Sequence, residues 1–257
     1  MRITRSAFVV PLIVLMIALA AEEAAGQTQR VERRTALSFQ IGTEPTVSGT
    51  FIHTTESGGR FGTRRAFKQS FPDLYSLPLR LGAEISHRMV KGPELAIRFD
   101  VTHASSRGQL EFAEAITLDT PPRRIVSLAR FGDYTSATFE GAARWRFLRH
   151  KPIQPYVGAI GGLALVRRIT IAPASLVGES GVNAGFYARS TVPTIGALFG
   201  SSVFVRPSLA LVVESGIRYQ RALHPQMPQG LSRPWSPEIY SGSRRSMSLS
   251  GGIQFWL

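Results

Sequence analysis

The residues whose types could carry out a reaction lie close together in one part of the chain: His103, Ser105 and, a little further on, Glu111 and Glu114. A hydroxyl, an imidazole and a carboxylate are the groups that nucleophilic hydrolysis needs. The hydroxyl attacks only when a base lies within hydrogen-bond reach and a third group orients that base. The spacing does not show such contacts, so an exposed histidine and serine that take part in no reaction are the alternative.

The residue pattern does not indicate a metal site or a cofactor site. The chain has no cysteine, and its five histidines are spread over the sequence, at His53, His87, His103, His150 and His224. No two of them have the spacing of metal ligands. No glycine-rich loop of the phosphate-binding kind follows a strand and opens a helix. We therefore expect neither a metal nor a cofactor.

Arginine is the second kind of residue that could carry a function, because the formal net charge is +13. Guanidinium groups pair with phosphate through two parallel hydrogen bonds. Four arginine pairs fall in or beside long connections: Arg64 and Arg65, Arg123 and Arg124, Arg167 and Arg168, and Arg244 and Arg245. In a cytosolic protein this charge would suggest nucleic acid. An exported protein meets lipid head groups and lipopolysaccharide instead, so we expect no nucleic acid. A solvated, salt-screened surface with no partner is the alternative.

The first residues have the three-part pattern of a secretory signal. Arg2 and Arg5 precede an apolar run over 7–21, and small residues follow it. We predict a signal peptide over 1–26 and a short charged tail over 27–35 in the periplasm. The alternative is one anchoring helix, but the run is shorter than the roughly 20 residues that a spanning helix needs. Without cysteine, an exported chain requires a fold that holds without disulfides.

The rest of the chain alternates between apolar and polar residues in eight segments. The last of them reads S-M-S-L-S-G-G-I-Q-F-W-L and has one apolar face and one face of small or polar residues. Successive side chains of a strand point to opposite faces, so this alternation predicts strands. The segments are 37–42, 77–86, 94–102, 137–147, 153–166, 192–205, 209–220 and 246–257. An extra hairpin in the first long connection, with a strand at 46–53, would make ten.

The connections between these segments alternate in length. Three are tight turns with glycine or proline, at 90–93, 149–152 and 206–208. The other four are long, at 43–76, 104–134, 168–191 and 221–244. Short turns at one end and long loops at the other are typical of a membrane β-barrel. Loops of this length are uncommon in a compact soluble domain.

The charged residues on the strands indicate which face points inward. They are Glu84, Arg98, Asp100, Glu140, Arg144, Glu214 and Arg218. Because both signs occur, they could form a salt-bridged interior in an eight-stranded barrel, which is just wide enough for side chains to fill. The apolar face would then meet lipid. The alternative is a soluble sandwich or lipocalin-like barrel, which places the apolar face inside and the charges in water.

Aromatic residues near the strand ends favour the membrane arrangement, because aromatic girdles mark both interfaces of membrane barrels. Those near the short turns are Trp145, Phe147, Phe255 and Trp256. Those near the long loops are Tyr75, Tyr134 and Tyr219. We expect these two groups to form the two girdles.

The mature chain resembles the small eight-stranded outer-membrane proteins of the OmpA/OmpX-like class. The resemblance lies in the signal peptide, the eight strands, the alternating connections and the terminal G-G-I-Q-F-W-L. It implies an all-β, antiparallel up-and-down transmembrane barrel over 36–257, a monomer that reaches the bacterial outer membrane after export through the inner membrane. It also implies that barrel-assembly machinery reads 246–257. The last residue is Leu257, where the class usually has an aromatic residue, so recognition of this strand is expected to be weaker.

The class contains proteins of very different function, so the fold does not fix the function. We expect a non-enzymatic structural or surface-interaction barrel whose basic loops contact outer-membrane lipid and lipopolysaccharide phosphates. The first alternative is a hydrolase that modifies lipid A, since His103, Ser105 and Glu114 resemble the H-x-S pair and glutamate of the eight-stranded lipid A deacylases. That resemblance is incomplete, because Ser106 stands where those enzymes have asparagine and the pair falls on an early strand. A narrow pore and a soluble periplasmic ligand-binding barrel are further alternatives.

Overall fold

The computed structural model of the chain describes residues 34–52, 56–59, 62–66, 68–90, 92–116, 124–174, 184–224 and 241–257. The predicted signal peptide over 1–26 and nearly all of the predicted tail over 27–35 lie outside these residues. In the part of the chain that is described, no helix is long and apolar enough to cross a membrane.

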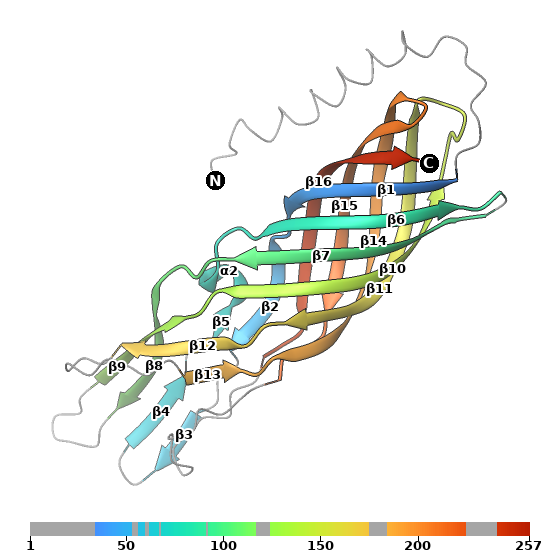
Figure 1. Cartoon of the computed structure of the whole chain (residues 1–257). Coiled ribbons are helices and arrows are strands. Elements are labelled where there is room, and N and C mark those ends of the chain that lie inside the picture. The colour runs from blue at the N-terminus through green and yellow to red at the C-terminus, as the bar shows by residue number, and fades with distance from the viewer. Residues whose placement is uncertain are drawn as a thin grey trace.

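Eight long antiparallel strands close into a barrel (Figure 1). In chain order they are β1 (Thr35–Thr43), β6 (Leu79–Arg88), β7 (Glu94–Ala104), β10 (Tyr134–Arg146), β11 (Ile153–Val166), β14 (Ser190–Arg206), β15 (Leu209–Gln220) and β16 (Arg244–Trp256). Each strand pairs with the next, and β16 returns to β1, with Trp256 opposite Ala36 and Leu249 opposite Thr43. The prediction of an all-β, eight-stranded up-and-down barrel is confirmed.

The connections alternate in length around the barrel, as predicted. Short turns join β6 to β7, β10 to β11 and β14 to β15. The first strand begins and the last strand ends beside these turns, where Leu257 donates its backbone N–H to Thr35 O at 2.8 Å. All four long connections emerge at the opposite end, which is called the loop end below.

The barrel buries its polar face and exposes its apolar face. Along β7 the burial alternates at every residue: Glu94, Ala96, Arg98 and Asp100 are buried, and each residue that alternates with them is exposed. Ile97 is 54% exposed, whereas Glu140 on the neighbouring strand is fully buried. This is the reverse of a water-soluble barrel, in which apolar side chains fill the interior. The soluble alternative is therefore excluded for this fold.

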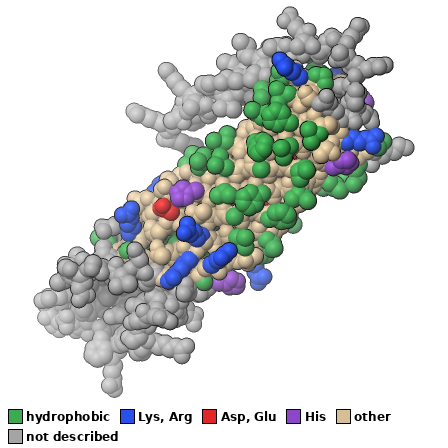
Figure 2. Space-filling view, viewed as in Figure 1, with side chains coloured by type: hydrophobic (Ala, Val, Ile, Leu, Met, Phe, Trp, Pro, Cys, Tyr) green, Lys and Arg blue, Asp and Glu red, His purple; other side chains and the backbone are tan. Residues whose placement is uncertain are grey.

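The outer face carries an apolar belt that runs round all eight strands. Figure 2 shows the apolar side chains on one side of the barrel. The belt includes Phe39, Leu81, Phe99, Phe139, Leu163, Ile195, Ile217 and Leu249. On the described barrel strands, the exposed residues of full charge are Arg206 and Arg245, which lie at opposite ends of the barrel. A belt free of charge between two charged rims is the surface that a hydrocarbon layer requires.

The aromatic girdles are only partly as predicted. Trp145, Phe147, Phe255 and Tyr219 are exposed on the outer face near the strand ends. Trp256, Tyr75 and Tyr134 point inward instead and are buried. The reason is the period of the strand: Trp256 directly follows the outward Phe255, and Tyr134 shares the parity of the inward Ser136 and Glu140.

The segment considered for an extra hairpin lengthens the first strand instead. β2 (Thr46–Ile52) follows β1 after the break at Glu44 and Pro45, and it pairs with the start of β16, with Arg245 opposite Ser48. The two segments therefore lie one after the other along the same edge of β16. β2 then pairs with β5 (Gln69–Ser70), which leads into the four-residue helix α2 (Phe71–Leu74). The barrel has eight strands, not ten.

The long connections contain a second sheet that the sequence pattern did not reveal. It is formed by β3 (Glu56–Gly59), β4 (Gly62–Ala66), β8 (Gln109–Ile116), β9 (Arg124–Phe131), β12 (Ile169–Ala174) and β13 (Ala184–Tyr187). Their order in space is β13-β12-β9-β8-β4-β3, so three loop hairpins lie side by side. This sheet extends from the loop end of the barrel (Figure 1). The sequence pattern predicts these connections only as long loops, with no sheet formed among them.

Glycines at inward positions make room for the large interior side chains. A Cβ atom on Gly200 would lie 2.6 Å from the Tyr156 hydroxyl and 2.5 Å from the Val213 carbonyl oxygen. A Cβ atom on Gly82 would lie 2.2 Å from Asp100 Oδ1. Small residues opposite large ones are how narrow barrels fill their interior.

The outer belt predicts how the barrel responds to a charge placed on it. Phe99 lies in the middle of β7, whereas Val205 lies beside Arg206 at the short-turn end. An arginine on the lipid face costs about 2–4 kcal/mol at the bilayer midplane and about 0–1 kcal/mol near an interface. Phe99→Arg should lower the free energy of unfolding in phospholipid vesicles by the larger amount, and the control Val205→Arg by the smaller one. Equal tolerance of both would show that β7 does not face hydrocarbon.

Candidate functional site

The interior of the barrel contains a cluster of ionised side chains. All seven residues predicted for it are buried inside. Five further buried residues complete it: Glu44, Arg80, Glu94, Arg146 and Arg244. The buried part of the described chain thus holds six arginines and six carboxylates. Four of the five were within reach of the sequence pattern, because each has the same parity as an inward neighbour, as Arg146 has with Arg144. Arg244 was not, because it lies before the predicted start of the last strand at 246.

The middle of the barrel holds two arginines between two glutamates. Arg144 pairs with both carboxylate oxygens of Glu84, and its Nη2 lies 3.3 Å from Glu214 Oε2. Arg98 Nη2 donates to Glu214 Oε1 at 2.7 Å and lies 3.2 Å from Glu84 Oε2. The Tyr156 hydroxyl donates to Glu214 Oε2 at 2.9 Å. Each carboxylate therefore lies against both cations.

A second layer lies nearer the loop end, around Arg218. Its Nε and Nη2 donate to the two carboxylate oxygens of Glu140 at 2.8 and 2.7 Å, and its Nη1 donates to Glu44. Asp100 Oδ2 lies 3.6 Å from Arg218 Nη2 and accepts a hydrogen bond from Arg80 at 2.7 Å. The contact with Glu140 has the bidentate geometry that makes arginine–carboxylate pairs strong.

A third layer closes the short-turn end. Arg146 donates to both carboxylate oxygens of Glu94, at 2.6 and 3.0 Å, and to the Ser202 hydroxyl at 2.7 Å. The guanidinium groups of Arg88 and Arg146 lie 4.3 and 5.7 Å from the centre of the Trp256 ring. The buried indole therefore contacts both cations at this end of the barrel.

These three layers fill the barrel rather than line a channel. The twelve charged side chains are each at most 6% exposed, so they are almost completely shielded from bulk water. Buried charges are tolerated only when they are paired and hydrogen bonded, and here each carboxylate has an arginine partner within 4 Å. The interior cluster is neutral in sum, so the net charge of +13 is carried by residues outside it.

An aromatic cluster covers the charges at the loop end. Phe51 lies at its centre, with ring centroids 5.0 to 5.9 Å from those of Phe71, Tyr75, Phe131, Phe186 and Tyr187. The Tyr187 hydroxyl donates to the backbone oxygen of Phe51, and burial raises the pKa of this phenol above its usual range. Residues from β2, α2 and the loop hairpins thus form an apolar cap over the interior.

The residues considered for hydrolysis lie outside the barrel wall. His103 and Ser105 are exposed at the loop end of β7. His103 Nδ1 lies 3.1 Å from the Thr135 hydroxyl, and the Ser105 backbone N–H donates to Ser76 Oγ at 3.1 Å. Among the described residues, no hydrogen bond joins the imidazole to the Ser105 hydroxyl. The backbone of Glu114 lies in β8, but its side chain is outside the described part of the structure.

Metal ligands are likewise not gathered in one place. Over the described ranges, no group of three or more histidine, aspartate or glutamate side chains has an arrangement that could hold a metal ion.

The predicted basic rim is described in part. Arg167, Arg168 and Arg245 are exposed at the loop end of the barrel. Arg64 and Arg65 in β4 and Arg124 in β9 are placed by their backbones alone, and Arg123 lies outside the described residues.

Arg244 differs from the prediction, because it is buried rather than exposed on the rim. The alternation along β16 that exposes Arg245 turns Arg244 inward. Its Nε donates to the Thr46 hydroxyl at 2.7 Å, and its guanidinium carbon lies 4.8 Å from the centre of the Tyr134 ring.

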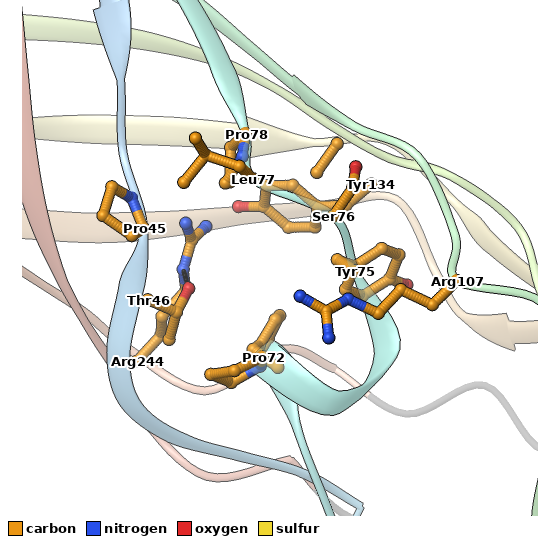
Figure 3. A pocket seen from close by; sticks show the side chains of 12 residues that line it. Pro45, Thr46, Pro72, Tyr75, Ser76, Leu77, Pro78, Arg107, Tyr134 and Arg244 are labelled. Carbon is orange, nitrogen blue, oxygen red and sulfur yellow. Dashed lines mark hydrogen bonds between the residues drawn. The ribbon is translucent and has the colours of Figure 1, made fainter. Parts of the chain in front are cut away.

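Arg244 also lines a cavity of about 110 Å³ at the loop end of the barrel (Figure 3). The other lining residues are Pro45, Thr46, Phe71, Pro72, Tyr75, Ser76, Leu77, Pro78, Ala104, Arg107 and Tyr134. Most of this lining is apolar or aromatic, and two arginines contribute positive charge. No sequence motif marked this cavity, because its walls come from five separate segments.

Three features identify the kind of fold: the sheet is closed, the interior is neutral, and the outer belt is apolar. It is a small transmembrane β-barrel of the outer-membrane type. No protein-family model matches the chain, and no curated protein matches it.

Solved structures of small outer-membrane barrels are similar to this one. Neisserial surface protein A is 15% identical over 87% of this chain and 97% of its own, with a TM-score of 0.43. The outer membrane protein AlkL is 15% identical over 90% of this chain and 94% of its own, also with a TM-score of 0.43. OprG from Pseudomonas aeruginosa is 8% identical over 88% of this chain and 98% of its own, with a TM-score of 0.37. The likeness concerns the barrel architecture alone.

The ion pairs predict a large loss of stability when one partner is removed. Arg218→Met leaves Glu140 and Glu44 without their closest cation, and breaking a buried pair in this way costs about 3–5 kcal/mol. Urea unfolding in vesicles should show this loss, and Arg218→Met with Glu140→Gln should recover part of it. Arg221→Met is the control, because this exposed arginine next to β15 should change stability by about 0.5 kcal/mol or less. Equal effects of both arginine variants would contradict a paired interior.

Proposed function

We propose that this chain is a non-enzymatic β-barrel of the bacterial outer membrane, with a structural or surface-interaction role carried by its loop end. The observation that carries this proposal is the apolar belt around a sealed, ion-paired interior. A closed barrel is the one β-structure that satisfies every backbone polar group within hydrocarbon. The predicted signal peptide over 1–26 provides the route of export in this proposal.

The loop end is where an interaction would take place. The loop sheet projects from the barrel there, and Arg167, Arg168 and Arg245 are exposed where the strands leave the apolar belt. These arginines lie at the level of lipid head groups if the belt is embedded. Contacts with the phosphates of lipopolysaccharide would seat the barrel in the outer leaflet, because guanidinium pairs with phosphate in a bidentate manner.

The rival functions have less support. A pore needs a water-filled lumen, which is found in barrels of about 16 strands, whereas side chains fill the eight strands here. A serine hydrolase needs its base in contact with the nucleophile, whereas His103 contacts Thr135 in this structure. Neither a pore nor a serine hydrolase would explain the arginines at the loop end.

Binding to lipopolysaccharide predicts a rise in thermal stability. Added lipopolysaccharide should raise the temperature at which the wild-type barrel loses its heat-modifiable migration on a gel, by about 2–4 °C per kcal/mol of binding. A variant with Arg167, Arg168 and Arg245 changed to Ala should lose most of this shift. Arg206→Ala, which removes an exposed arginine at the short-turn end, should keep it. Absence of a shift in the wild-type protein would exclude the contact.

A non-enzymatic role predicts that Ser105 is dispensable for lipid chemistry. Cells that produce the Ser105→Ala variant should contain lipid A with the same acyl chains as cells that produce the wild-type protein, as judged by mass spectrometry. An acyl chain that is removed only when Ser105 is present would establish the hydrolase instead. Cells without the protein provide the baseline for both comparisons.

A further inference from the structure

The wall of the barrel is interrupted at one place near the loop end. β1 pairs with β6 as far as Thr43 opposite Leu79, and the last contact is Glu44 N–H donating to Pro78 O at 3.4 Å. Pro45 and Pro78 follow on the two sides of the gap. Proline has no backbone N–H, so it cannot continue a ladder of strand hydrogen bonds.

Beyond these prolines the two sides of the wall take different partners. β2 follows β16. The segment before β6 follows the extension of β7 instead: Ser76 N–H donates to Ser105 O at 2.9 Å, and Arg107 N–H donates to Leu74 O at 2.8 Å. The strands therefore separate here, and the cavity of about 110 Å³ occupies the gap. We call this gap with its cavity the lateral notch.

Two arginines supply the positive charge of the lateral notch, and the Glu44 carboxylate lies beside one of them, with Oε1 3.9 Å from Arg244 Nη2. Both guanidinium groups are directed into the cavity, Arg244 from β16 behind β2 and Arg107 from the opposite side (Figure 3). Nε and Nη2 of Arg244 are held by Thr46 Oγ1 at 2.7 Å and by Glu44 O at 3.4 Å. Among the described residues no acceptor is found for its Nη1. Arg107 is exposed, so its side chain can meet a ligand at the mouth.

The mouth of the lateral notch is continuous with the apolar belt. Leu77 lines the cavity and is 66% exposed, and Leu79 and Ile41 continue the exposed apolar surface below it. Val47 on β2 is also exposed beside it. A soluble anion would gain nothing from this surface, whereas acyl chains would lie along it. The notch lies where the belt ends, which is the level of lipid head groups.

We propose that the lateral notch binds one lipid with an anionic phosphate head group, the phosphate between Arg107 and Arg244 and the acyl chains on the belt below Leu77. The cavity has room for several water molecules or one phosphate group, not for a whole lipid. This proposal rests on the membrane location proposed above, but not on the basic rim. It differs from a diffuse electrostatic attraction between the arginine rim and many lipids, because it places one lipid at one position in the barrel wall.

Native mass spectrometry of the full chain in neutral detergent tests the proposal. The probes are dioleoyl phosphatidic acid, dioleoyl phosphatidylcholine with the same acyl chains, and glycerol phosphate with no acyl chain. The wild-type protein should retain one phosphatidic acid molecule under conditions in which phosphatidylcholine is lost, and glycerol phosphate at equal concentration should not displace it. Arg107→Glu should lower the apparent affinity for phosphatidic acid about tenfold or more, because a charge-assisted pair becomes a repulsion. Leu77→Asp should also lower it.

Arg221→Glu is the matched control, since this exposed arginine lies at the same end of the barrel but outside both the lateral notch and the basic rim. It should change the affinity by about twofold or less, as expected for a screened surface charge. Heat-modifiable migration on a gel confirms that each variant forms a closed barrel. Equal retention by Arg107→Glu and the wild-type protein would overturn the proposal, as would equal retention of phosphatidylcholine. Displacement by glycerol phosphate would show a site for a soluble phosphate instead. Loss of binding in the rim variant Arg168→Glu but not in Arg107→Glu would assign the lipid to the rim.

Discussion

The pairing of charges inside a sealed cylinder is the interaction on which the rest of this structure depends. Because hydrocarbon must surround the barrel, polar side chains have to point inward, where water does not reach them. Ionised groups survive there only in pairs. Arg144 and Arg98 between Glu84 and Glu214 show how the chain meets this condition: each cation contacts both anions, and the Tyr156 hydroxyl donates a further hydrogen bond to Glu214.

This pairing also fixes how the strands are aligned. A slip of one residue between neighbouring strands would move every inward side chain to the outer face. For β7 it would place Arg98 and Asp100 in lipid and bring Ile97 and Phe99 inside. The inward glycines add a steric condition, since Gly200 leaves space that the Tyr156 ring fills. Charge, size and apolar surface therefore select the same register.

The barrel could be predicted from the sequence because its rule is local: each residue lies on one face or the other according to its parity. Parity placed Glu140 and Arg218 correctly, and it would also have placed Glu44 inside, since Gln40 and Gly42 precede it at intervals of two. The loop sheet and the lateral notch depend instead on which distant segment a strand chooses as its partner. β2 pairs with β16 rather than with a neighbour in sequence, and no alternation reports that choice. Arg244 was misplaced for the same reason, because its burial follows from how far β16 extends.

The seam between β1 and β16 joins the two ends of the described chain, with Ala36 opposite Trp256. Pairing of these two strands closes the longest loop in the chain and therefore has the largest cost in loop-closure entropy, so closure of the cylinder is expected late in folding. Pairs such as Arg218 with Glu44 connect early and late strands and cannot form before that step. The open sheet must therefore keep its ionised side chains hydrated during assembly. Water leaves the lumen only when the seam closes, and so dehydration of the charges and completion of the wall are one event.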